Sequence, residues 1–362
     1  MKIGVPKEII PQEYRVGINP ETAQLLIENG HELFIQDSAG SDSGYENTDY
    51  EEIGCSILDN AEDVFGVSDL IVKVKEPSFQ EVELLENKII FTYLHLSSSK
   101  ELTEKLLEHN VTGIAYETVD VNGELPMLKP MSEIAGRLSL LDCISLLKKN
   151  NQGKGKLISG TSLADPANVL ILGAGIVGVN ALQMSIGLGA NTTILDINES
   201  RLNEIKTQYP QANTLISTPE TINNLLPKMD IVIGAVLTAG AKPPTLITKE
   251  MLKLMQSKSI LSDVSIDQGG CFETSKPTTH DSPTYEVEDI IHYCVKNIPS
   301  AVPFTATNAL NEATRSFILR LANNGVKDDE LKMGLNTHKG CLTNKEVAVA
   351  HELDYTDSNK IL

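Results

Sequence analysis

The sequence predicts an α/β protein built from two doubly wound domains, and three observations lead to this prediction. Short apolar runs alternate with amphipathic segments through residues 1–128, a pattern typical of βα units that build a largely parallel sheet. A wholly apolar run over 169–172 enters a glycine motif, and a helical pattern follows. Further apolar runs over 231–236 and 259–264 supply the additional strands that such an open sheet requires.

The first domain alternates strands with helices. A helix is expected over residues 20–29, because Pro20 suits a first helical position and Gly30 provides a stop. The expected strands cover residues 3–5, 32–36, 70–74, 88–94 and 113–116.

The middle and the end of the chain are expected to be mostly helical. One long helix is predicted over 132–150 from apolar residues at helical spacing, and the glycine-rich segment 151–156 predicts a flexible loop. The helical pattern returns over 305–324, and a last short helix is expected over 344–353. Periodicity alone does not show whether this C-terminal segment packs on the first domain.

The length, net charge and hydropathy of the chain limit its domain number and the molecules that it binds. A length of 362 residues indicates two or three domains, and a net charge of −19 disfavours nucleic acids and anionic membranes. Specific basic residues must therefore bind any anionic substrate locally. No apolar run reaches the roughly 18 residues of a membrane span, and the N-terminus lacks the features of a secretory signal.

The five cysteines are scattered and odd in number, without a C-x-x-C motif or zinc-ligand spacing. They are interpreted as reduced thiols of a cytoplasmic protein, and no metal is expected. These residues are Cys55, Cys143, Cys271, Cys294 and Cys341.

The glycine motif predicts a Rossmann site for NAD. Gly173 permits a tight turn, Gly175 lets a pyrophosphate approach the backbone, and Gly178 lets helix and strand pack closely. Asp196 ends the next apolar run about 20 residues later, where a carboxylate accepts the ribose hydroxyls and disfavours the 2′-phosphate of NADP. Arg201 is open to three interpretations: it stacks on adenine, tolerates a 2′-phosphate, or is a solvated helix residue.

Three polar residues follow apolar strands directly: Lys75, His95 and Asp267. Ligands of open α/β sheets bind at the carboxyl ends of strands, so these side chains are candidates for binding an anionic substrate and moving protons. Arg15, in a polar loop after the first strand, can hold a carboxylate with its guanidinium fork.

Each of these residues also fits a purely structural role. Lys75 fits a solvated strand exit, His95 a hydrogen-bonded core histidine, and Asp267 a cap of the turn before two glycines. Taken singly, none of them decides between the two interpretations.

Taken together, these residues lie within sequence strings that resemble the alanine dehydrogenases, a family of NAD-dependent enzymes related to the α subunit of the proton-translocating transhydrogenase. The strings run nearly end to end and keep the family's order. They are residues 3–8, 15–16, 72–77, 91–96, 115–119, 130–137, the glycine motif, 233–237, 240–242, 266–270 and 301–303.

The resemblance implies a domain organisation and a set of roles. Residues 129–300 would form the Rossmann domain, inserted into a discontinuous substrate domain of residues 1–128 and 301–362. Arg15 and Lys75 would bind pyruvate, His95 would be the general acid/base, and Asp267 would assist proton transfer and ammonia addition. The implied cofactor-binding residues are Ser132, Gly173, Gly175, Ile176, Val177, Gly178, Asp196, Arg201, Ser217, Val236, Leu237 and Asn297.

The implied reaction is the reversible conversion of L-alanine, NAD and water to pyruvate, ammonium and NADH by a homo-oligomer, usually a hexamer. Two alternatives remain open: an NAD(H)-binding module of a transhydrogenase, and an NAD-binding paralogue with weak catalysis. The chain departs from the family at Phe304, Ile298, the loop 160–165 and the helix segment 140–143, which puts subunit packing and catalytic rate in question.

Overall fold

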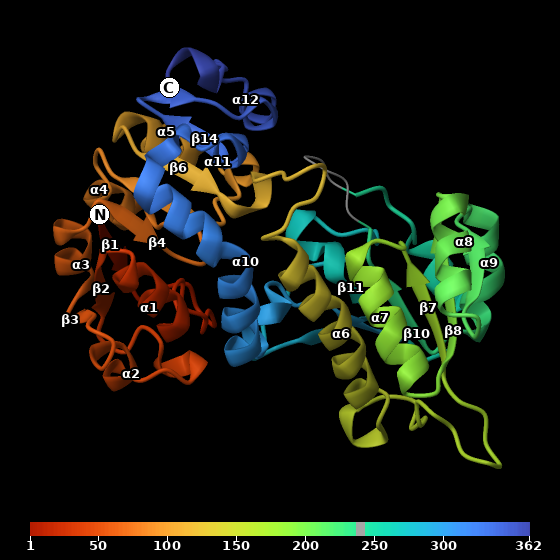
Figure 1. The fold of residues 1–362 in the computed structure, drawn as a ribbon. Helices are drawn as coiled ribbons and strands as arrows, with labels where there is room; N and C mark the ends of the chain where they lie inside the picture. The colour runs from red at the N-terminus through yellow and green to blue at the C-terminus, as the bar shows by residue number, and fades with distance from the viewer. Residues whose placement is uncertain (237–242) are drawn as a thin grey trace. The chain divides into compact units, whose positions relative to one another are not determined.

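The computed structural model describes residues 1–236 and 243–362 (Figure 1). The described chain divides into two compact units, each built around one sheet. Unit 1 comprises Met1–Met131 and Ser300–Leu362, and unit 2 comprises Ser132–Pro299. The α/β fold class expected from the sequence is confirmed.

Unit 1 contains an eight-stranded sheet of order β15-β14-β6-β5-β4-β1-β2-β3. The six strands from β6 to β3 are parallel. After β1 the chain adds β2 and β3 on one side of it and then β4, β5 and β6 on the other side, so the strand order reverses at β1. The carboxyl ends of β1 and β4 therefore flank the point where ligands of doubly wound sheets bind. These strands are β1 Lys2–Val5, β2 Glu32–Gln36, β3 Ser56–Leu58, β4 Leu70–Val72, β5 Ile89–Thr92 and β6 Thr112–Ala115.

The first helix of unit 1 begins where the sequence places it. The Asn19 side chain accepts a hydrogen bond from the Thr22 amide, and Pro20 occupies the first turn, so the helix is capped by the residues that precede it. The helices of unit 1 are α1 Pro20–Glu28, α2 Asn47–Glu51, α3 Ala61–Val67, α4 Phe79–Leu84, α5 Lys100–Glu108, α10 Pro303–Asn324, α11 Asp329–Met333 and α12 Lys345–His351.

The C-terminal segment completes the sheet of unit 1. Strand β14 Leu335–His338 pairs antiparallel with β6, and β15 Cys341–Leu342 pairs with β14. Sequence periodicity did not predict these strands, because the buried face of β14 is polar. Thr337 is fully buried, where its hydroxyl accepts from the Gly113 amide and donates to the Val111 carbonyl.

Unit 2 contains a seven-stranded sheet of order β12-β13-β11-β10-β7-β8-β9, parallel except for β12. From β9 to β13 this is the strand order 3-2-1-4-5-6 of dinucleotide-binding domains, with β7 at the centre. The strands are β7 Asn168–Leu172, β8 Asn191–Asp196, β9 Asn213–Ile216, β10 Ile231–Gly234, β11 Ile260–Asp263, β12 Thr284–Val287 and β13 Ile290–Tyr293.

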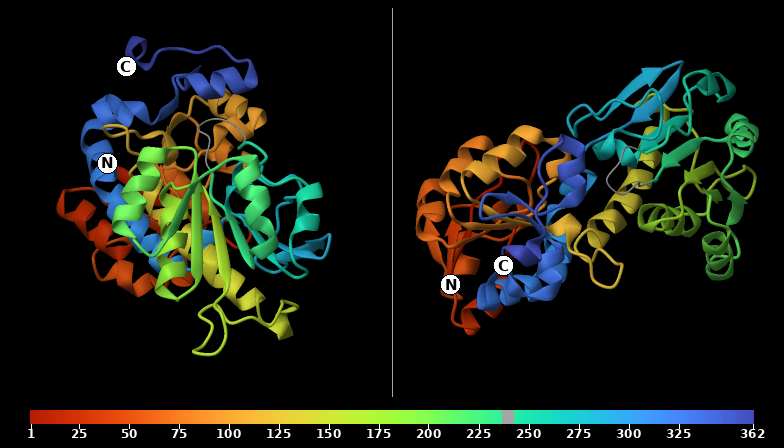
Figure 2. Two further views of the ribbon diagram at one scale, coloured as in Figure 1. Left: turned by 90° about the vertical axis from the view of Figure 1, so that its right-hand side faces the viewer. Right: turned by 90° about the horizontal axis from the view of Figure 1, so that it is seen from above.

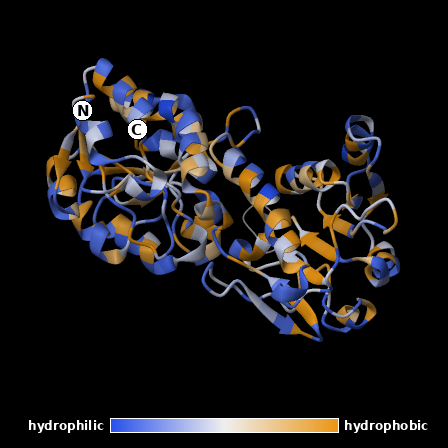
Figure 3. Ribbon diagram, turned by 90° about the horizontal axis from the view of Figure 1, so that it is seen from below, coloured by the Kyte–Doolittle hydropathy of each residue, from blue (hydrophilic) through white to orange (hydrophobic). Residues whose placement is uncertain are grey.

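Helices cover both faces of this sheet (Figure 2, left). Alternate residues of β7 point to opposite faces: Ile171 packs in a core with α6 and α7, whereas Leu170 packs in a second core with α9. The central strands β7 and β10 are accordingly apolar along most of their length (Figure 3). The helices of unit 2 are α6, which begins in unit 1 and spans Lys129–Leu146, α7 Ile176–Gly187, α8 Glu199–Gln208 and α9 Pro219–Leu225.

The glycine-rich segment 151–156, expected as a loop, follows α6 and is hydrogen-bonded at both glycines and both lysines. The amides of Gly153 and Gly155 donate to the carbonyls of Lys148 and Leu147, just after α6. Lys154 and Lys156 both bind the Asp230 carboxylate, at 2.9 and 2.7 Å. Asp230 is 2% exposed and also accepts from the Asn168 amide. One buried carboxylate therefore ties the segment to the sheet.

Asp230→Asn is expected to lower the free energy of unfolding by about 2 kcal/mol, because two charge-assisted hydrogen bonds weaken. Burial raises the pKa of Asp230, but Lys154, Lys156 and the Asn168 amide outweigh it and hold the pKa below its usual range. The stabilisation is therefore complete above the unfolded pKa of about 3.9 and is lost as the pH falls through the lower folded pKa. Urea unfolding of both proteins between pH 3 and 7 measures this, and a constant difference would contradict it.

Residues at which the sequence departs from the family it resembles make packing contacts or hydrogen bonds in the structure. Phe304 is exposed and stacks on Tyr45 with ring centroids 5.8 Å apart, and Ile298 is buried against Tyr293. In α6, Cys143 is buried in the core and the Asp142 carboxylate accepts from the Tyr293 hydroxyl at 2.5 Å. These departures are therefore compatible with the fold.

Candidate active site

The glycine loop of unit 2 connects β7 to α7. Gly173 has a φ of +106°, and a Cβ there would lie 2.5 Å from the Ala235 carbonyl oxygen; a Cβ at Gly178 would lie 1.9 Å from the Gly173 carbonyl oxygen. Both positions require glycine for folding alone. A Cβ at Gly175 would meet nothing within 4 Å, so folding does not require glycine there. The open side of the loop and the N-terminus of α7, which begins with Ile176 and Val177, fit a pyrophosphate that approaches the backbone.

Asp196 ends β8 beside this loop. One carboxylate oxygen accepts from the Ala174 amide at 2.7 Å and the other from the Asn198 amide at 2.9 Å. Each oxygen has further lone pairs, so the carboxylate can also accept ribose hydroxyls. Arg201 donates from Nε to the Ala174 carbonyl and pairs with Glu204, which places its guanidinium against the loop.

The other predicted cofactor residues of unit 2 lie on several elements. Val236 follows β10, and its carbonyl accepts from the Ser265 hydroxyl; Ser217 follows β9, and its amide donates to the Asp196 carbonyl. Ser132 lies in α6. Asn297 has a φ of +59°, and Leu237 lies outside the described residues.

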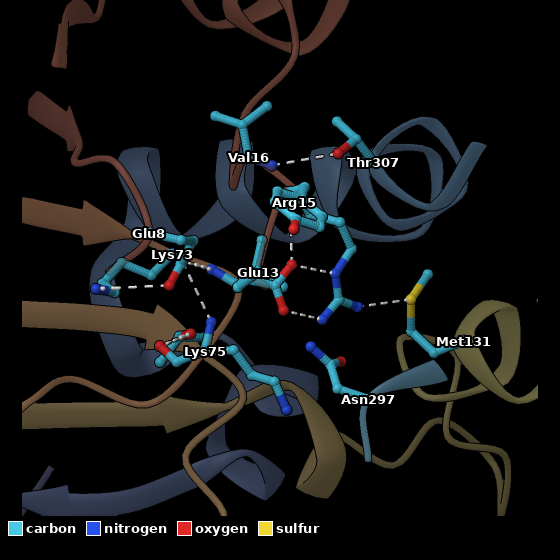
Figure 4. Close-up of polar contacts among 12 residues, drawn as sticks. Glu8, Glu13, Arg15, Val16, Lys73, Lys75, Met131, Asn297 and Thr307 are labelled. Carbon is cyan, nitrogen blue, oxygen red and sulfur yellow. Dashed lines mark hydrogen bonds and ion pairs between the residues drawn. The ribbon is translucent and has the colours of Figure 1, made fainter. Parts of the chain in front are cut away.

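In unit 1, the guanidinium fork of Arg15 binds an internal carboxylate (Figure 4). Nε and Nη2 of Arg15 donate to Glu13 at 2.7 and 2.5 Å, and Nη1 contacts the Met131 sulfur. Both side chains are almost fully buried. Burial lowers the Arg15 pKa, but Glu13 outweighs it, so the pKa is raised and Arg15 stays charged. Within the polar loop expected after the first strand, Arg15 and Glu13 therefore form a buried ion pair.

Lys75 follows β4, and hydrogen bonds to its amide and carbonyl fix its backbone. Its amide donates to Glu8 at 3.3 Å, and its carbonyl accepts from the Thr92 hydroxyl at 2.8 Å. Glu8 also accepts from the Val74 amide at 2.6 Å. The ends of β4 and β5 are therefore joined by hydrogen bonds, which brings Lys75 and His95 to the same edge of the sheet.

Beneath Lys75 lies a buried cluster that sequence analysis did not predict. Lys73 is 1% exposed, and its ammonium binds Glu81 and lies 3.7 Å from a Glu8 oxygen. Burial raises the pKa of Glu8, and Lys73 lowers it only in part. The only sequence signal for this cluster was a lysine within an otherwise apolar strand.

His95 follows β5 and is half-exposed. Its backbone is left-handed, with φ +48° and ψ +35°. The ring stacks on Tyr93 with centroids 5.8 Å apart, and a cavity of about 310 Å³ adjoins it. The expectation that His95 is accessible for proton transfer is therefore compatible with its surroundings, whereas a fully enclosed core histidine is not.

Glu117 contacts His95 and was missed as a site residue. It lies just after β6, and its carboxylate accepts from the Leu94 and His95 amides at 3.1 and 2.6 Å. The signal was available, because Glu117 follows an apolar strand just as Lys75 and His95 do. Asp267 lies in unit 2, in the 3₁₀ turn Val264–Gln268 after β11, and is exposed.

No cluster of three histidine, cysteine or acidic residues with metal-binding geometry occurs in residues 1–236 and 243–362. Among the helices of that part of the chain, none has the length and apolar character needed to cross a membrane.

Unit 2 has the strand order and the glycine loop of a dinucleotide-binding domain. In unit 1, Arg15, Lys75 and His95 follow the carboxyl ends of β1, β4 and β5. This combination is typical of a dinucleotide-dependent oxidoreductase. The chain belongs to the alanine dehydrogenase/PNT family: residues 4–135 match its N-terminal domain, and residues 140–345 match its C-terminal domain. The family resemblance seen in the sequence is confirmed.

Individual relatives agree with this assignment. The chain is 45% identical to an alanine dehydrogenase of Staphylococcus haemolyticus, with 98% of each chain covered. A solved L-alanine dehydrogenase superposes with a TM-score of 0.94 at 42% identity, covering 97% of this chain and 99% of the other. A transhydrogenase from Sinorhizobium meliloti shares the fold, with a TM-score of 0.83 at 20% identity over 95% of this chain and 99% of the other.

Proposed function

We propose that this chain catalyses the reversible, NAD-dependent oxidative deamination of L-alanine to pyruvate and ammonium. The observation that carries the proposal is the placement of Lys75 and His95 at one sheet edge of unit 1, in a chain 45% identical to an alanine dehydrogenase over nearly its full length. Residues 1–128 and 301–362 would form the substrate domain and 129–300 the Rossmann domain. The protein would be a cytoplasmic homo-oligomer, a hexamer as is usual in the family.

The glycine loop of unit 2 fits NAD, and the proposed cofactor residues would hold it there. Backbone amides at the start of α7 would bind the pyrophosphate, and Asp196 would accept the ribose hydroxyls. Arg201, Ser217, Val236, Leu237, Ser132 and Asn297 complete the proposed cofactor set. Bound there, NAD would supply the hydride acceptor for deamination.

In unit 1, Arg15 would bind the substrate carboxylate. Glu13 holds the Nε–Nη2 edge of its guanidinium and keeps Arg15 charged for this role. Lys75 would donate a hydrogen bond to the carbonyl or carbinolamine oxygen and stabilise its developing negative charge.

His95 would add or remove the proton at that same oxygen, since an imidazole can both accept and donate a proton. Asp267 would assist the addition and loss of ammonia. Every one of these residues is present in the chain, so the proposed reaction requires no group that the sequence lacks.

The direct test is the growth of NADH absorbance when the purified protein is given NAD and L-alanine at alkaline pH. NADP, serine, glycine and 2-aminobutyrate serve as parallel substrates. NADH formation with alanine supports the proposal. Bound NAD without turnover of any amino acid would instead indicate a transhydrogenase-like module or a catalytically weak paralogue.

Asp196→Ala is expected to raise the Kd for NAD about tenfold or more, because a charge-assisted hydrogen bond to ribose contributes about 1.5–3 kcal/mol. Asp196→Asn keeps an oxygen for the Ala174 amide but loses the charge, so it should reduce the discrimination against NADP. Isothermal titration with NAD and NADP measures both effects. Equal NAD affinity in wild type and Asp196→Ala would show that the ribose contact is assigned incorrectly.

A further inference from the structure

Glu117 contacts His95 at two places. Its Oε1 atom accepts hydrogen bonds from the Leu94 and His95 amides at 3.1 and 2.6 Å, and the same atom lies 3.9 Å from Nδ1 of the His95 ring. Glu117 reaches this position from the 3₁₀ turn after β6, which pairs with β5. One carboxylate therefore faces both the backbone and the imidazole of His95.

The backbone contact stabilises an unfavourable conformation. His95 is a non-glycine residue in the left-handed region, which is sterically unfavourable for a residue with a Cβ. With this geometry the Leu94 and His95 amides converge on one point, and the Glu117 oxygen lies there. This conformation sets the direction in which the imidazole leaves the chain.

The contacts with Tyr93 and Glu117 orient the His95 ring and favour one of its tautomers. Tyr93 stacks on the ring at an interplanar angle of 5°, and the Tyr93 hydroxyl is fixed by a 2.6 Å hydrogen bond to the Met127 carbonyl. A carboxylate on the Nδ1 side favours the tautomer that carries its proton on Nδ1. That tautomer leaves the lone pair on Nε2, the nitrogen on the opposite side of the ring from Glu117.

We propose that Glu117 is a positioning residue for the reaction: it fixes the backbone of His95, selects its Nδ1–H tautomer and stabilises the imidazolium formed when Nε2 takes a proton. This inference rests on the proposed role of His95. It adds a residue that acts through His95 and does not itself touch the substrate.

The two contacts predict different effects for two substitutions. Gln at position 117 retains an oxygen that can accept both amides, but it lacks the charge that favours the imidazolium. Ala removes both contacts. A purely structural role would therefore tolerate Gln, whereas a role in proton transfer would not.

Steady-state kinetics with NADH, pyruvate and ammonium tests this in the full-length protein. Glu117→Gln is expected to lower kcat about 10- to 100-fold, with the KM for pyruvate and the Kd for NADH changed less than about twofold. Glu124→Gln, an exposed glutamate of the same unit, is the matched control and should behave like wild type. Wild-type kcat in Glu117→Gln would overturn the proposal.

A double-mutant cycle separates action through His95 from an independent effect. In a His95→Ala background, Glu117→Gln should cause no further loss of kcat. A further loss of the same size as in the wild-type background would show that Glu117 does not act through His95.

Amide hydrogen exchange gives a readout that does not depend on turnover. Peptides covering residues 93–98 should exchange faster in Glu117→Ala than in wild type, and Glu117→Gln should retain the protection. Unchanged exchange in Glu117→Ala would refute the backbone role. Absence of alanine turnover in wild type would refute the proposed function, while the exchange result would still decide whether Glu117 positions His95.

Discussion

His95→Ala is expected to lower kcat by about 10²- to 10⁴-fold while leaving the Kd for NADH within about twofold of wild type. The imidazole is the group proposed to move a proton at the substrate oxygen. His95 belongs to unit 1, whereas the glycine loop and Asp196 belong to unit 2, so the substitution leaves the dinucleotide-binding elements intact. Absorbance assays of pyruvate amination measure kcat, and NADH fluorescence titration measures binding.

The control for this prediction is a histidine outside the site. His109 ends α5 and caps it through its backbone amide, so His109→Ala should retain wild-type turnover. Both variants remove one imidazole from unit 1. If His95→Ala also retained turnover, the acid/base assignment would be wrong, although the family assignment would stand.

Lys73→Met is expected to lower the free energy of unfolding by about 3–5 kcal/mol, the largest stability effect we predict for a single substitution. Lys73 is 1% exposed and lies between two carboxylates, those of Glu8 and Glu81. Removing the ammonium leaves both carboxylates buried without their cation, and breaking a buried ion pair in this way costs about that much. Urea unfolding measures the difference.

The size of this effect should depend on pH in a defined direction. Burial raises the pKa of Glu8 in the folded protein. A carboxyl with a raised folded pKa binds its proton more tightly in the folded state, so the folded state gains stability as the pH falls through that pKa. Without Lys73 this gain increases, so the deficit of Lys73→Met should shrink between pH 8 and pH 5.

Two further variants make this prediction specific. Lys100→Met removes a half-exposed lysine that is 4.0 Å from Glu104, and it should change stability by less than about 0.5 kcal/mol. Adding Glu81→Gln to Lys73→Met should recover part of the loss, because it removes one buried charge. A Lys73→Met protein as stable as wild type at pH 8 would contradict this account of the cluster.

The sequence predicted the Rossmann unit because its signals are local. The apolar strand, the turn at Gly173 and the strand that ends in Asp196 follow one another within a single βαβ segment. The same rule placed Lys75 and His95 at strand ends. Glu117 obeys that rule as well, but only the pairing of β6 with β5 shows that its carboxylate reaches His95.

Two features of unit 1 were not predictable from local patterns. Strand β14 is polar on its buried face, so no hydrophobic alternation marks it, and its partner β6 is distant in the chain. Arg15 looked available for a ligand, yet its fork binds Glu13 two residues away. Residue spacing does not show how a loop folds back on itself.

The sequence by itself determined the α/β class, the family, the dinucleotide loop and the strand-end candidates, because each is encoded by residues close together in the chain or by strings in a fixed order. Only the tertiary structure decided which charges meet: Lys73 with Glu8 and Glu81, and Glu117 with His95. The contacts of Lys73 with Glu8 and of Glu117 with His95 join segments that follow different strands, so they form only when the sheet brings the ends of those strands together. The contact of Lys73 with Glu81 forms when the turn after β4 leads into α4.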